Sequence, residues 1–172
     1  MIYTNQDNQH EMLPIVTPDG RVTGSATRGE CHNGSMLLHP VVHLHVFNSC
    51  GELYLQRRPM WKDIQPGKWD TAVGGHVDYG EDTDTALMRE ASEELGLDAT
   101  GCKHLQTYVF RSSRECELIH AYSLVTDTPV HPSKETDGGR FWSMEEIRQS
   151  MGTGVFTPNF EQEFTRLFDR QQ

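Results

Sequence analysis

The stretch from Gly75 to Leu97 constrains what this chain can become more than any other part of the sequence. Glu90, Glu93 and Glu94 are spaced three and four residues apart, so a helix would bring all of them to one face. Like charges that converge in this way raise the cost of ionisation, and a hard divalent cation bound by carboxylate oxygens is the usual way to offset it. The spacing therefore predicts a helix with an acidic, metal-binding stripe.

A second stripe of the same helix is apolar and consists of Leu87, Ala91 and Leu95, with Met88 beside it. This pattern predicts a helix over about 82–95 that docks on a hydrophobic core, and Gly96 is a typical helix stop. The residues ahead of the helix include Gly74, Gly75 and Gly80. Because glycine permits a tight backbone, we expect a glycine-rich turn that folds close to the carboxylates.

The rest of the chain alternates short strands with loops. We expect strands at 13–16, 21–26, 39–47, 52–56, 69–73, 105–111, 117–125 and 140–142, a short helix within 27–35, and helices at 143–150 and from Thr157 to about Arg170. Mixed strands with helices before and after them indicate an α/β fold in which helices pack on both faces of a mixed sheet. We expect one domain over residues 1–172, with its core at about 38–170 and an N-terminal hairpin extension at about 12–30.

Composition narrows the class of protein. The net charge of −10 argues against nucleic-acid binding as the main role. The sequence has no apolar run of about 18 residues that could cross a membrane, and its polar start lacks the apolar core of a signal peptide. Its four cysteines form no CxxC pair and are expected to be free thiols in a reducing compartment. We therefore expect a cytoplasmic protein with no membrane partner, and we leave a homodimer open.

Gly75, Glu81 and the run from Arg89 to Leu97 match the Nudix box at every fixed position, with Ala91 where a larger aliphatic residue is commoner. On this motif the chain is identified as a member of the Nudix hydrolase superfamily. The resemblance implies an α/β/α Nudix sandwich, here with the hairpin added. It also implies a hydrolase that depends on Mg²⁺ or Mn²⁺ and cleaves a diphosphate linkage in a nucleoside diphosphate-type or other small organic diphosphate.

The same resemblance implies roles for individual residues. Glu90, Glu93 and Glu94 would be catalytic and would bind the metal together with the carbonyl of Gly75. Members of the family differ in which glutamate acts as the general base, and we favour Glu93 here. Glu81 and Arg89 are expected to pair and to brace the loop against the helix.

A second pattern consists of His32, His39, Pro59-Met60-Trp61-Lys62, Pro66-Gly67-Lys68-Trp69, Gly75-His76 and Glu115-Cys116-Glu117. It covers roughly residues 13–165 and resembles type 1 isopentenyl-diphosphate isomerase, itself a Nudix-fold enzyme. It implies a second divalent metal at His32, His39, His76, Glu115 and Glu117. Imidazoles combined with carboxylates suit Zn²⁺, Mn²⁺ or Fe²⁺. It also implies a diphosphate-binding loop with the basic residues Arg57, Arg58, Lys62 and Lys68, since guanidinium groups suit phosphate. The alternatives are chance histidine pairs and a solvated basic loop.

One departure from the isomerase pattern concerns its catalytic cysteine, because this chain has Gly74 at that position. Glu117, which matches the second catalytic group, is kept. Moving a proton across an allylic unit needs two placed acid/base groups, and glycine supplies none. We therefore expect a hydrolase, with isopentenyl-diphosphate isomerase and a non-catalytic Nudix-fold binding module as the alternatives.

Overall fold

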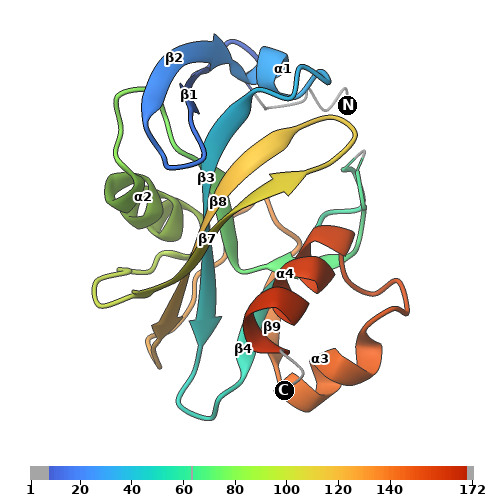
Figure 1. Cartoon of the computed structure of the whole chain (residues 1–172). Coiled ribbons are helices and arrows are strands. Elements are labelled where there is room, and N and C mark those ends of the chain that lie inside the picture. Colours follow the sequence, from blue (N-terminus) through green and yellow to red (C-terminus); the bar gives the residue numbers. More distant parts are fainter. Residues whose placement is uncertain (1–7, 63, 170–172) are drawn as a thin grey trace.

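The computed structural model describes residues 8–62 and 64–169 (Figure 1). Its strands are β1 (Met12–Val16), β2 (Val22–Thr27), β3 (Leu38–Phe47), β4 (Leu53–Arg57), β5 (Trp69–Thr71), β6 (Val73–His76), β7 (Lys103–Arg111), β8 (Cys116–Val125) and β9 (Gly139–Trp142). Its helices are α1 (Arg28–Cys31), α2 (Thr83–Leu95), α3 (Met144–Ser150) and α4 (Pro158–Phe168). In these described residues no helix is both long and apolar enough to cross a bilayer.

Strand β3 is the centre of a seven-stranded mixed sheet. It pairs in parallel with β8 over its whole length, from Leu38 opposite Cys116 to Phe47 opposite Val125. Strand β6 runs antiparallel to β3, and β7 runs antiparallel to β8. Strands β5, β4 and β9 form a second antiparallel part, which joins β3 at the pair Phe47 and Leu53. The prediction of a mixed sheet is confirmed.

The two faces of β3 carry different side chains because successive residues of a strand point to opposite sides. Val42, Leu44 and Val46 share one core with Leu87 and the rest of the apolar stripe of α2. On the opposite face, the rings of His45 and Phe47 contact Phe168 of α4, with centroids 5.1 and 5.4 Å away. Helix α2 thus covers one face of the sheet and α4 the other, which is the expected sandwich (Figure 1).

Helix α2 begins and ends close to the predicted residues. The carboxylate of Asp82 caps it by accepting a 2.7 Å hydrogen bond from the Thr85 amide, and Gly96 ends it with a left-handed φ of 63°. The predicted apolar stripe of Leu87, Ala91 and Leu95 is buried, and Ala86 is buried with it, whereas Met88 beside the stripe is 38% exposed.

The predicted strand at 69–73 is two strands. Strand β5 pairs with β4, whereas β6 pairs with β3, so the chain passes from one part of the sheet to the other at Ala72. Gly74 and Gly75 lie within β6, opposite His43 and Val42, and the expected tight turn at these glycines is therefore wrong. The positive φ of this region belongs to Gly80, at 85°.

The N-terminal hairpin is present as predicted. Strands β1 and β2 pair around the turn at 17–21, and Leu13, Ala26 and Cys31 form a small core between the hairpin and α1. The hairpin packs β1 against β3. At the other end of the chain, α4 ends at Phe168, and the predicted helix end at Arg170 lies outside the described residues.

Candidate active site

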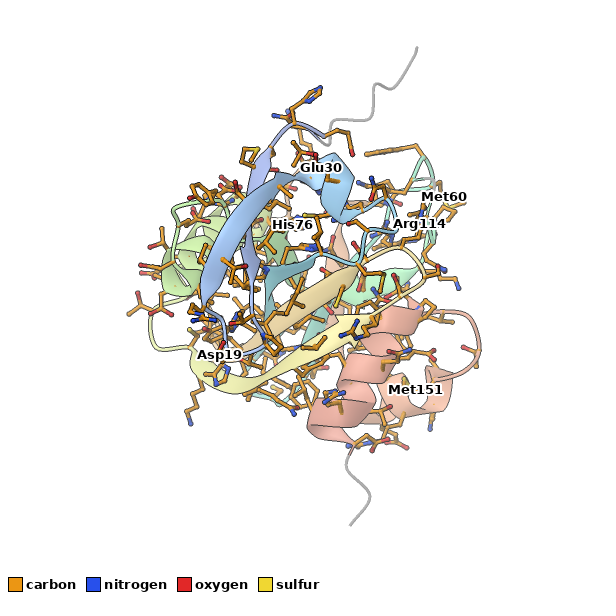
Figure 2. All side chains as sticks on the ribbon, turned by 45° about the horizontal axis from the view of Figure 1, so that its top comes forward. Asp19, Glu30, Met60, His76, Arg114 and Met151 are labelled. Carbon is orange, nitrogen blue, oxygen red and sulfur yellow. The ribbon has the colours of Figure 1, made fainter. Side chains whose placement is uncertain are left out.

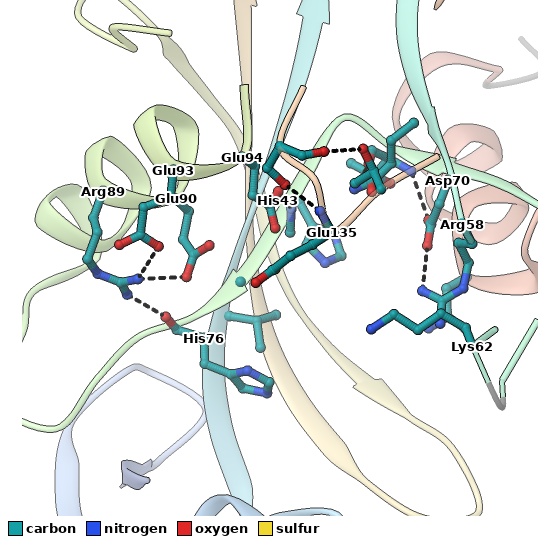
Figure 3. Close-up of a pocket in the computed structure, with 18 of the residues that line it drawn as sticks. His43, Arg58, Lys62, Asp70, His76, Arg89, Glu90, Glu93, Glu94 and Glu135 are labelled. Atoms are coloured by element: carbon teal, nitrogen blue, oxygen red, sulfur yellow. Dashed lines mark hydrogen bonds and ion pairs between the residues drawn. The ribbon is translucent and has the colours of Figure 1, made fainter. Parts of the chain in front are cut away.

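A cleft of about 560 Å³ lies beside α2, between β6 and the loop that follows β4 (Figure 3). Acidic side chains dominate its lining. They come from the segment before β1, from α2, β5 and β8, and from the loop before β9, and are Glu11, Glu90, Glu93, Glu94, Asp70, Glu117 and Glu135. The basic residues of the lining are Arg28, Arg58, Lys62 and Arg89. The cleft therefore combines many carboxylates with a few cations, as expected of a site that binds both metal ions and an anionic ligand.

The three glutamates of the acidic stripe converge as predicted but differ in exposure. Glu94 is held deep in the cleft, where its Oε2 accepts a 3.2 Å hydrogen bond from the Gly74 amide. Burial and the nearby charge of Glu90 raise the pKa of Glu94 to about 8. Burial also raises the pKa of Glu90. Glu93, by contrast, has a side chain that is 62% exposed. Glu90 and Glu94 thus lie in an environment that favours either the neutral form of each carboxyl group or a bound cation.

Gly75 is needed for close approach rather than for backbone conformation. A Cβ at this position would lie 2.2 Å from the carboxyl carbon of Glu90, so any side chain there would displace the Glu90 carboxylate. The backbone of β6 therefore lies directly against the Glu90 carboxylate. Gly74, one residue earlier, is different, because a Cβ there would meet only the ring of His43 at an ordinary 3.4 Å.

Arg89 connects the loop before α2 to the helix. It forms a two-pronged ion pair with Glu81, with N–O distances of 2.9 and 3.0 Å. It also donates to the carbonyl of His76 at 3.1 Å and to Glu90 at 2.8 Å. The hydrogen bonds from Arg89 hold the pKa of Glu81 below its usual value. Residues 76–81 are thereby fixed against the acidic stripe.

A second group of side chains assembles around His76 of β6, next to the cleft that His76 and Glu117 also line. Nε2 of His32 lies 3.2 Å from Nε2 of His76 and 3.2 Å from Oε2 of Glu115. The ligand atoms of His32, His39 and His76 all lie within 4.8 Å of one another, and so do those of His39, Glu115 and Glu117. His76 appears between the hairpin and the central sheet in Figure 2. The predicted set of five residues is therefore brought together.

The donor set of this group fits a metal ion. His39 is fully buried, its Nδ1 is 2.9 Å from the carbonyl of Leu37, and its Nε2 has no hydrogen-bond partner within the described chain. Such an arrangement, with one ring nitrogen held by a carbonyl and the other free, is typical of metal-binding histidines. Burial also lowers the pKa values of His39 and His76, which favours the neutral form that binds metals. Burial, with Glu115 nearby, raises the pKa of Glu117 to about 8.

The four basic residues predicted to bind substrate separate into two pairs. Arg58 and Lys62 line the cleft, and Arg58 lies 3.6 Å from Asp70 (Figure 3). Arg57 and Lys68 are not among the lining residues. Adjacent residues of an extended chain point to opposite sides, so Arg57 turns away from the cleft when Arg58 faces it and lies 3.9 Å from Asp137 instead. The backbone of Lys68 pairs with that of Arg58.

Several residues of the cleft were missed from the sequence. Arg28 and Glu135 reach it from α1 and from the loop before β9, where no local pattern marks them. His43 also lines it and is paired with Glu163 of α4. A signal for this pair did exist, because Glu163 interrupts the apolar stripe formed by Phe160 and Phe164.

A mixed sheet between helices, with an acidic helix beside a glycine-containing strand, defines a Nudix-fold protein. The chain belongs to this family, since the family model of the NUDIX domain matches residues 37–160. An uncharacterised Nudix hydrolase of Pseudomonas aeruginosa is 32% identical over 143 residues, covering 80% of this chain and 84% of that protein. An isopentenyl-diphosphate delta-isomerase of Clavibacter michiganensis is 30% identical over 141 residues, covering 78% and 73%. A solved protein of Deinococcus radiodurans has a TM-score of 0.78 at 25% identity, covering 92% of this chain and 99% of that one.

Proposed function

We propose that the protein is a metal-dependent hydrolase that cleaves a diphosphate linkage in a small organic diphosphate, such as a nucleoside diphosphate derivative. The observation that carries this proposal is the burial of Glu90 and Glu94 side by side against β6, with both pKa values raised. Closely spaced buried acids are costly, and a divalent cation offsets that cost. Membership of the Nudix family supports the same conclusion.

Glu90, Glu93, Glu94 and the carbonyl of Gly75 would hold Mg²⁺ or Mn²⁺. When bound, such ions neutralise the diphosphate oxygens and lower the pKa of bound water. Glu93 is our candidate for the general base, because its carboxylate is exposed to water at the cleft and only one of its oxygens, 3.5 Å from Arg89, is paired. Arg58 and Lys62 would bind the negative charge of the substrate.

We further propose that His32, His39, His76, Glu115 and Glu117 hold a second divalent ion, Zn²⁺, Mn²⁺ or Fe²⁺. The unpartnered Nε2 of buried His39 supports this site. An isomerase of isopentenyl diphosphate is the second candidate function, because the same five residues and several relatives fit it. Gly74 weighs against it, since it leaves only Glu117 of the two required acid/base groups. A cytoplasmic location and a homodimer stay predictions.

The deciding experiment is a hydrolysis screen over nucleoside, sugar, cofactor and prenyl diphosphates, read by mass spectrometry. We expect at least one compound to be cleaved at the phosphoanhydride bond with Mg²⁺ or Mn²⁺ present and to be stable in excess chelator. Conversion of isopentenyl to dimethylallyl diphosphate without loss of phosphate would favour the isomerase. Binding without turnover of any compound would favour a non-catalytic module.

A further inference from the structure

A buried charge network lies beneath the floor of the cleft. At its centre is Glu163 of α4, whose side chain is 2% exposed. Nδ1 of His43 lies 2.7 Å from one of its carboxylate oxygens, and the hydroxyl of Tyr108 donates to the other at 3.1 Å. Nε2 of His45 is 3.3 Å from the same oxygen as His43. A helix and two strands thus converge on one carboxylate.

This arrangement keeps His43 charged. A buried carboxylate is costly unless a cation and hydrogen bonds compensate it, and of the groups around Glu163 it is His43 that makes the short contact. Burial by itself lowers the pKa of His43, but Glu163, Glu117 and Asp70 together outweigh it and raise the pKa to about 9. These acids face His43 from α4, β8 and β5. The ring is therefore an imidazolium fixed by the fold.

The other edge of the same ring faces the cleft. His43 is among the lining residues, and its side chain is 20% exposed. A Cβ on Gly74 would lie 3.4 Å from Cδ2 of His43 and 3.7 Å from Nε2. Gly74 therefore leaves open space beside this edge. Within the described residues Nε2 makes no hydrogen bond, although an imidazolium donates from both nitrogens.

We propose that His43 is a substrate-binding residue whose Nε2–H donates to a phosphate oxygen of the substrate, with Glu163 as the residue that positions it. This inference rests on the proposed diphosphate hydrolase function. It explains how a cleft lined by Glu90, Glu93, Glu94, Asp70, Glu117 and Glu135 can hold a polyanion. Arg58 and Lys62 lie on or beside a loop, whereas His43 is a cation built into the central strand.

Binding of methylenediphosphonate tests the proposal, because this P–C–P compound carries the phosphate charge but resists hydrolysis. Calorimetric titration with Mg²⁺ present would compare wild type, His43→Gln and His45→Gln. His45→Gln is the matched control, since it removes a histidine from the same strand and the same carboxylate but from outside the cleft lining. We expect His43→Gln to weaken binding about tenfold or more, the scale of one charge-assisted hydrogen bond. His45→Gln should bind within about twofold of wild type.

Nitrogen-15 NMR of histidine-labelled wild type provides a second measurement that needs no variant to fold. The Nε2 signal of His43 should move when the diphosphonate is added, and the signals of His45 should not. Four results would each overturn the inference. They are equal affinity of wild type and His43→Gln, an equal loss of affinity in both variants, an Nε2 signal of His43 that does not move, and no binding by wild type. Hydrolysis is scored separately. If the protein hydrolyses diphosphates without needing His43, the proposed function holds and this inference fails. If it binds the diphosphonate through His43 but hydrolyses no diphosphate, this inference holds and the proposed function fails.

Discussion

The amide of Gly74 donates a 3.2 Å hydrogen bond to Oε2 of Glu94, twenty residues further along the chain. Strand β6 and helix α2 are thereby joined at the point where the backbone and the acidic stripe meet. The bond fixes the carboxylate of Glu94, which is one of the ligands of the proposed metal site. Organisation of this kind reduces the cost of forming a metal site.

Replacement of Glu93 or Glu94 by Gln should lower kcat by about 10² or more, the scale of losing a general base or a metal ligand. Glu145→Gln, on the exposed side of α3, is the control and should keep wild-type activity. Steady-state kinetics with Mg²⁺ would measure the effect, and circular dichroism would check the fold. Full activity in both site variants would contradict the proposed roles.

The metal-free protein should be stabilised by Glu94→Gln at alkaline pH. Burial raises the pKa of Glu94 from 4.5 to about 8. An acid with a higher pKa in the folded state favours folding only while it is protonated, so its effect on stability worsens as the pH rises from about 4.5 to about 8. In chelator, the melting temperature of Glu94→Gln should exceed that of wild type at pH 8 and match it more closely at pH 5. The opposite ordering would show that Glu94 is ionised at no cost.

Protein purified without a histidine tag should carry a tightly held transition metal. Elemental analysis should find it in wild type, find it lost in His32→Asn, and find it retained in His10→Asn, whose histidine is exposed and outside the cluster. His32 is the better target than fully buried His39, because its substitution disturbs packing less. Metal-free wild type after growth with zinc and manganese would remove this site and leave the carboxylate site unaffected.

Wild type should interconvert isopentenyl and dimethylallyl diphosphate at far below about 1 s⁻¹, a rate typical of an enzyme. Gly74→Cys should fold, because the new Cβ meets only an ordinary contact with His43, and it should raise the isomerisation rate. Product analysis by chromatography would measure both proteins. Rapid isomerisation by wild type would require another proton carrier. Cys31 and Cys116 are poor candidates, since both are buried and burial raises the pKa of Cys31 to about 11.

Local sequence patterns predicted the parts of the fold that depend on local spacing. The acidic and apolar stripes of α2 follow from its periodicity, and Glu81 and Arg89 could be paired because the motif fixes their separation. The split of the strand at Ala72 could not be predicted, since it depends on which neighbour each half finds in the sheet. The pairing of His43 with Glu163 spans 120 residues, and only the docking of α4 on β3 brings it about.

His32 lies ahead of the segment that the family model recognises, which begins at residue 37. Arg28 and Glu11, which line the cleft, lie ahead of it too. A protein trimmed at that border would keep every residue of the Nudix box but would lose one imidazole of the histidine cluster and one of the cations. The segment that the family model recognises is therefore shorter than the segment that supplies the cleft and the histidine cluster. A comparison restricted to the recognised segment would not distinguish proteins that differ at His32.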